Sequence, residues 1–228
     1  MVVAADRRFR NLRGDLVLDT RDFAVALKKL RKLRRVGPID ELNIDKTVDL
    51  TCRNGGWIEL VFERHRRNDL KVLLLMDTGG SMTPFHQIVS RLFSAAQHLR
   101  HFKLFKHFWF HNTIYNVIYE DMDTQKEYPT VKLLRDFDSK TRLIIVGDAS
   151  MHPWELDDAN PWTKNYIFHL SSLEWLQVLR RHFEKAVWLN PLRFTQRFRA
   201  ETLDQIAAIF PMFELTLDGL DAAVKKLV

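Results

Sequence analysis

The chain has 228 residues, of which 46% are hydrophobic and 28% charged, as is ordinary for one globular domain with a full core. No apolar run approaches the roughly 20 residues needed to cross a bilayer, no N-terminal segment resembles a signal peptide, and the single cysteine, Cys52, fits a reducing cytoplasm. The formal charge of +6 allows an acidic partner without requiring one.

Residues 1–56 are predicted to form a basic, helical N-terminal extension, followed by an α/β domain over residues 57–228. Residues 20–35 carry apolar side chains at helical spacing, with Thr20 as a possible cap. The opposite face is basic and is interpreted as solvated, with contact to an acidic protein or a nucleic-acid backbone as the alternative. Residues 40–54 favour a short helix that ends at Gly55 and Gly56.

The α/β domain is expected to begin with an edge strand, because residues 57–63 (WIELVFE) alternate apolar and polar side chains. A charged turn over residues 63–69 then leads into KVLLLMD, a short apolar run typical of a buried parallel strand, which ends in Asp77. Thr83 and Pro84 have the character of an N-cap and a first helical residue. They predict a helix over residues 84–100 that packs one apolar stripe on the sheet.

Residues 104–110 and 113–119 are predicted to form a hairpin, with only His111 and Asn112 between them. After a polar loop over 121–128, a short helix is expected over 131–137. Residues 142–147 (RLIIVG) form a second apolar strand that ends in an aspartate, Asp148.

The last third alternates helix and strand. A long loop over residues 151–168 carries Trp154 and Trp162, which are either anchors for a partner or a lid folded on the core. The remaining predicted elements are a helix from Ser171 or Ser172 to 183, a strand over 186–189, a basic loop over 193–199, a helix over 202–210, a strand over 213–217 and a final helix capped by Asp218. This order predicts a Rossmann-like open, mostly parallel six-stranded sheet with helices on both faces.

The two strand-end aspartates are the strongest chemical signal. If the chain crosses in opposite directions after these two strands, the strands are neighbours at the switch point, and Asp77 and Asp148 converge on one crevice. Two carboxylates with nearby hydroxyls suit a hard divalent cation. The alternative is that each aspartate only caps a helix.

The sequence strand–DTGGSM–helix, PT before a short helix, and strand–GDASM resembles the von Willebrand factor A-type (VWA) domain, in its CoxE-like branch. The resemblance covers residue 57 to the C-terminus. It implies a metal-ion-dependent adhesion site (MIDAS) held by Asp77, Ser81, Thr130 and Asp148, with Mg²⁺ or Mn²⁺ as the cation and Ca²⁺ as the alternative. Gly79 stands where the family has a serine, so we expect a water there and weaker metal binding.

The resemblance further implies a binding module, not an enzyme. A partner protein's acidic side chain would complete the metal shell, and the resemblance implies a MoxR-like AAA+ ATPase as that partner, acting in the remodelling or maturation of a protein complex. A metal-dependent hydrolase is the alternative, with His111 or His152 as the candidate bases near the crevice. Nucleic-acid binding through the basic helix and the 193–199 loop ranks last, because no nucleic-acid-binding signature is present.

Overall fold

The computed structural model describes residues 19–157, 170–192 and 201–228. Its body is a seven-stranded sheet in the order β6-β5-β4-β3-β7-β8-β9. Strands β3, β4, β7, β8 and β9 run parallel, whereas β5 is antiparallel to both its neighbours. The strands are β3 (Lys71–Asp77), β4 (Leu104–Phe110), β5 (Val117–Tyr119), β6 (Glu127–Pro129), β7 (Arg142–Val146), β8 (Lys185–Asn190) and β9 (Met212–Glu214).

The predicted Rossmann-like, mostly parallel sheet is therefore confirmed, with seven strands where six were expected. The sheet gains β6, where the sequence predicted a polar loop, and lacks the edge strand predicted over residues 57–63. The exposed ends of β6 gave no strand pattern, but Tyr128 at its centre is buried and lies 4.5 Å from the ring of Phe108.

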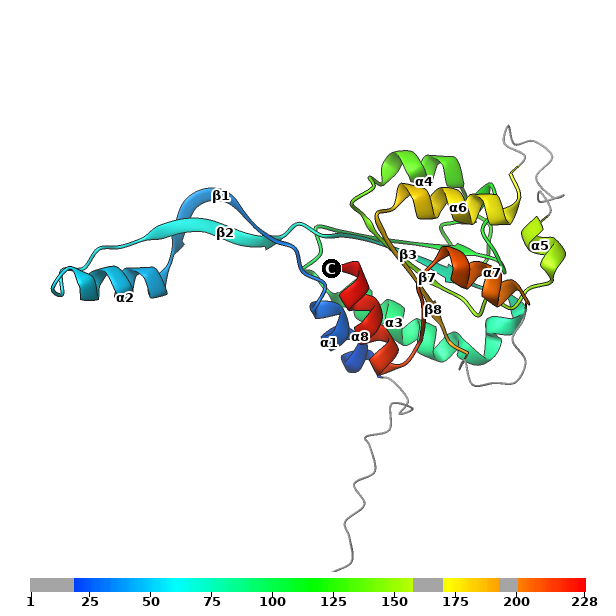
Figure 1. Cartoon of the computed structure of the whole chain (residues 1–228), viewed down its shortest axis with the longest axis horizontal. Coiled ribbons are helices and arrows are strands. Elements are labelled where there is room, and N and C mark those ends of the chain that lie inside the picture. Colours follow the sequence, from blue (N-terminus) through cyan, green and yellow to red (C-terminus); the bar gives the residue numbers. More distant parts are fainter. Residues whose placement is uncertain (1–18, 158–169, 193–200) are drawn as a thin grey trace, which may run out of the picture.

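Helices cover both faces of the sheet (Figure 1). Residues of α1, α3 and α8 join one apolar cluster, and residues of α4, α6 and α7 join a second. Successive residues of β3 alternate between these clusters, which is why this strand is an unbroken apolar run. The helices are α1 (Thr20–Lys28), α3 (His86–His98), α4 (Thr130–Asp136), α5 (Pro153–Asp157), α6 (Ser172–His182), α7 (Glu201–Ile209) and α8 (Leu217–Leu227).

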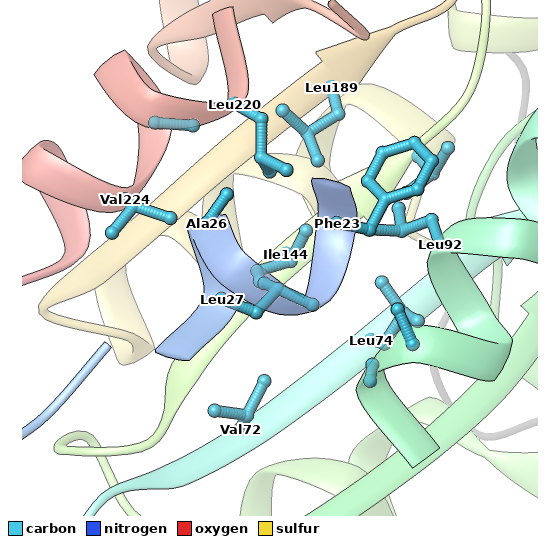
Figure 2. Packing of buried hydrophobic residues seen from close by; sticks show 14 of the residues in the cluster. Phe23, Ala26, Leu27, Val72, Leu74, Leu92, Ile144, Leu189, Leu220 and Val224 are labelled. Carbon is cyan, nitrogen blue, oxygen red and sulfur yellow. The ribbon is translucent and has the colours of Figure 1, made fainter. Parts of the chain in front are cut away.

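Helix α1 is part of the core. Phe23, Ala26 and Leu27 point into the cluster formed by the sheet, α3 and α8 (Figure 2). The predicted helix over residues 20–35 is too long, because α1 ends at Lys28 and Leu33 already belongs to a strand. The N-cap is Asp19, not Thr20; its side chain accepts hydrogen bonds from two backbone N–H groups.

Residues 33–68 form an arm that projects from the body (Figure 1). Strand β1 (Leu33–Leu42) pairs antiparallel with β2 (Phe62–Asn68), and α2 (Ile44–Arg53) lies between them in the chain and at the arm's far end. The short helix is as predicted. The edge strand over 57–63 and the turn over 63–69 are wrong: the strand is β2, and it pairs only with β1.

These errors have a physical cause. In a two-stranded ribbon both faces are largely exposed, so alternation of apolar and polar residues no longer marks a buried face. The arm exposes many large apolar side chains, with Trp57 83% exposed. The others are Leu33, Ile39, Leu42, Ile44, Val48, Ile58, Leu60 and Phe62.

Several boundaries also differ from the predictions. The chain enters α3 through a 3₁₀ turn, η1 (Gly80–Phe85), in which Thr83 makes no N-cap contact. The predicted strand over 113–119 is reduced to β5, because Thr113 and Asn116 hydrogen-bond to α6 and do not pair with β4. The final helix is capped by Thr216, not Asp218, and the predicted loop over 151–168 contains α5.

The capping box of α6, formed by Ser171 and Glu174, agrees with the sequence. Trp162 and the basic loop over 193–199 lie outside the described residues. Within the described segments, no helix has both the length and the apolar character needed to cross a membrane.

Candidate metal centre

The two aspartates singled out by the sequence lie at the carboxyl ends of neighbouring strands. Strand β3 pairs with β4 on one side and β7 on the other. The chain moves from β3 toward β4 and from β7 toward β8, in opposite directions across the sheet. This is a topological switch point, where open α/β sheets bind their ligands. Asp77 ends β3, and Asp148 follows the end of β7 by two residues.

Asp77 is a buried carboxylate with one satisfied and one unsatisfied oxygen. Only 2% of the residue is exposed. Its Oδ1 accepts hydrogen bonds from the backbone N–H groups of Gly79 at 2.7 Å and Asn112 at 2.9 Å. Its Oδ2 is buried and has no hydrogen-bond partner among the described residues. A buried carboxylate oxygen without a donor is costly, so its position fits a cation.

The charges around Asp77 also favour a bound cation. Burial raises the pKa of Asp77 from its ordinary 3.8 to about 7, and the negative charges of Asp148 and Glu155 add to this rise, against the two N–H donors. Among the described residues, Asp148 and Glu155 thus raise this pKa, and no basic side chain contributes against them. A bound divalent cation would reverse that pKa rise, because it stabilises the ionised carboxylates.

Asp148 is held close to Asp77 by tight packing of the two strand ends. It is 3% exposed, and its Oδ1 accepts the N–H of Ser150 at 3.0 Å. A Cβ added at Gly147 would lie 3.2 Å from the Cβ of Asp77 and 3.2 Å from the Trp188 ring. The Trp188 indole N–H also donates to the Gly147 carbonyl at 2.7 Å. Glycine therefore lets the two strand ends approach.

Neither aspartate caps a helix. The 3₁₀ turn after β3 has Gly79 as its N-cap and no side-chain cap, and Asp148 bonds to Ser150 ahead of α5. The capping alternative from the sequence is therefore wrong for the described residues.

Two further residues of the site, Asn112 and Glu155, were not predicted from the sequence. Asn112 has a positive φ of 57°, which asparagine tolerates better than most residues, and its side-chain amide donates to Glu155 Oε2 at 3.0 Å. A Cβ at Gly79 would lie only 2.0 Å from Asn112 Oδ1. The Asn112 amide, and not the expected water, therefore fills the space beside Gly79. The available signal was an asparagine at the carboxyl end of a strand next to β3.

Ser81 and Thr130 occupy different environments. Ser81 is exposed in η1, whereas Thr130 is fully buried at the start of α4. The Thr130 hydroxyl donates its proton to the Tyr115 carbonyl at 2.5 Å, so only the lone pairs of its oxygen remain for another contact. In the part of the chain that the structure describes, no hydrogen bond links Ser81 or Thr130 to either aspartate.

The donor set suits a hard cation. Among the described residues, no three His, Cys, Asp or Glu side chains are grouped to hold a metal ion. A cation beside Asp77 and Asp148 would therefore take the rest of its shell from neutral oxygens and water, as Mg²⁺ does. His111 and His152 are both exposed.

The mostly parallel sheet, with helices on both faces and two buried aspartates at its switch point, defines an α/β domain of Rossmann-like class. Residues 16–123 match the family model described as "VWA domain containing CoxE-like protein", so this part of the chain is similar to CoxE-like VWA-domain proteins. The matched segment includes Asp77 and Ser81 and ends before Thr130 and Asp148. Neither a search of curated proteins nor a search of solved structures found a match.

Without metal, the stability of the protein should fall as pH rises. Because the pKa of Asp77 is about 7 in the folded protein and near 3.8 when unfolded, the folded state holds the proton more tightly between those values. The stabilisation is complete below pH 3.8 and lost by about pH 7, at a cost of roughly 4 kcal/mol. Urea unfolding in EDTA from pH 4 to pH 8, compared with Asp77→Asn, measures this difference. If the free energies of unfolding of the two proteins changed with pH in the same way, this prediction would be wrong.

Proposed function

We propose that this protein is a metal-ion-dependent protein-binding module and not an enzyme. Asp77, Ser81, Thr130 and Asp148 would hold one divalent cation, Mg²⁺ or Mn²⁺. The observation that carries the proposal is the buried Oδ2 of Asp77, which has no donor among the described residues and lies at the strand end next to Asp148.

When bound, the cation supplies a fixed positive charge with a coordination position open to a partner's carboxylate. The chain's own residues prepare that position. Two N–H groups fix Asp77 Oδ1, which leaves Oδ2 beside Gly147 without a donor among the described residues. Glu155 accepts from the Asn112 amide and from the His152 N–H at 3.2 Å, so these bonds tie the loops around the crevice together.

The partner we propose is a protein with an acidic side chain at its contact surface, and the CoxE-like family points to a MoxR-like AAA+ ATPase that remodels or matures a protein complex. The apolar side chains exposed along the arm support a protein partner, because soluble domains rarely expose so many without a contact to make.

Affinity capture with and without metal tests this function. The purified protein is used as bait in lysate with Mg²⁺, with EDTA, and as the Asp77→Asn variant with Mg²⁺. We expect an AAA+ ATPase only in the first sample, identified by mass spectrometry and then reconstituted from purified components. Equal capture in all three samples would overturn metal dependence. Turnover of a generic phosphate ester that is lost in Asp77→Asn would favour the hydrolase alternative.

Gly79→Ser should not tighten metal binding by itself, although the sequence suggested that it would. The new Cβ meets Asn112 Oδ1, so the asparagine must rotate and give up its bond to Glu155. In Gly79→Ser/Asn112→Gly the space is free, and glycine keeps the positive φ at residue 112. We expect the double variant to bind Mg²⁺ at least tenfold more tightly than Gly79→Ser by calorimetry. Equal affinities would show that Asn112 does not control this position.

A further inference from the structure

A cavity lies away from the metal centre, where the arm joins the body. It has a volume of about 770 Å³ and is lined by three segments: the residues after α1, the end of β2, and the loop between α3 and β4. The last two segments lead into the amino ends of β3 and β4, so the cavity lies at the edge of the sheet opposite Asp77. Its charged and aromatic lining residues are Arg31, Arg66, Arg67, Asp69, Arg100, His101, Phe102 and Lys103.

The lining is strongly cationic. Four arginines and one lysine face one acid, so its formal charge is 5 − 1 = +4 with histidine neutral. That acid, Asp69, is already shared by Lys103 at 2.6 Å and Arg34 at 3.1 Å. Arg31, Arg66, Arg67 and Arg100 make no ion pair with any described carboxylate. Like charges gathered without counter-ions repel, and an anion in the cavity would relieve this repulsion.

The predominance of arginine over lysine in the lining indicates the chemistry of the ligand. Arginine dominates the lining, and its planar fork matches a phosphate group with two parallel hydrogen bonds. A volume of 770 Å³ is in the range of small-molecule sites. A terminal phosphate carries about 1.5 to 2 negative charges, so two or three linked phosphates balance the charge of this lining. Half-buried Phe102 adds an aromatic ring suited to stacking a base.

We infer that this cavity, which we call the arginine cleft, binds a phosphate-bearing ligand of nucleotide size. The shared chemistry is a chain of phosphates next to a planar base, supplied by a free nucleotide or by the backbone of a nucleic acid. The cleft works without the cation at Asp77, so it is independent of the proposed protein-binding function.

The test is calorimetry in EDTA at 150 mM salt with ATP, pyrophosphate, adenosine and a short single-stranded oligonucleotide as separate probes. ATP and pyrophosphate should bind, and adenosine should not. Arg66→Gln/Arg100→Gln should weaken ATP binding at least tenfold. The matched control is Arg64→Gln, on the same strand but outside the cleft, which should stay within twofold of wild type. Asp77→Asn should also stay within twofold.

The probes also separate the two sources. Oligonucleotide binding tenfold tighter than ATP, and lost in the double variant, assigns the cleft to a nucleic-acid backbone; weaker oligonucleotide binding assigns it to a free nucleotide. Binding of adenosine as tightly as ATP, equal losses in Arg64→Gln and the double variant, or binding of polyglutamate in place of every phosphate probe would overturn the inference. Thermal melting of each variant confirms that the replaced surface arginines leave the fold intact.

Discussion

Asp77→Asn is expected to weaken Mg²⁺ and Mn²⁺ binding at least a hundredfold, or about 2.7 kcal/mol. Asparagine has the shape of aspartate and can still accept the two N–H bonds at Oδ1, so the loop geometry is kept. What it loses is the negative charge on the oxygen that has no other partner. Isothermal titration calorimetry at pH 8, where the wild-type carboxyl is ionised, measures the loss.

The control is Asp157→Asn, an exposed carboxylate on the nearby α5, which should leave the affinity within twofold. The Asp77→Asn variant should also differ from wild type in stability when no metal is present. In EDTA at pH 8 it should be more stable than wild type, because it removes a buried, ionised and partly unsatisfied carboxylate. A variant that binds metal as well as wild type would refute the assignment of Asp77.

Phe23→Ala is expected to destabilise the protein by about 3–5 kcal/mol. Phe23 is fully buried, and its ring packs in the cluster that joins α1 to α3, α8 and the sheet (Figure 2). Truncation leaves a cavity in the interior, and a loose basic extension would show no such effect. Urea unfolding followed by circular dichroism measures the change.

Val25→Ala is the matched control, because Val25 lies on the same helix and is 52% exposed. It should change stability by no more than about 0.5 kcal/mol. If Phe23→Ala prevents folding, Phe23→Leu gives the same comparison at smaller cost. Equal, small effects of the Phe23 and Val25 substitutions would mean that α1 does not stabilise the body.

The sequence predicts best the elements that are buried on both sides. Strand β3 is observed at residues 71–77 and β7 at 142–146, close to their predicted bounds, because a strand covered on both faces must be an unbroken apolar run. Helix α6 follows its capping box. The prediction fails in the arm, where exposed strands carry no periodic constraint and tertiary pairing alone decides which residues form β1 and β2. The domain boundary at residues 56 and 57 stays a prediction.

The residues of the candidate site also differ in whether the sequence predicts them. Asp77 and Asp148 could be predicted because each ends an apolar strand and the crossover directions make those strands neighbours. Asn112 and Glu155 could not, since one lies in the turn after β4 and the other on α5, and tertiary contacts bring them together. The role of Thr130 comes only from family resemblance, and its buried hydroxyl is already bonded to Tyr115.

Anomalous X-ray scattering from crystals soaked in Mn²⁺ tests the central claim most directly. The account predicts one manganese peak per chain, within coordination distance of Oδ2 of Asp77 and of the Asp148 carboxylate, that disappears in Asp77→Asn crystals. A fully soaked crystal with no peak beside Asp77, or with its only peak at surface carboxylates elsewhere, would contradict it.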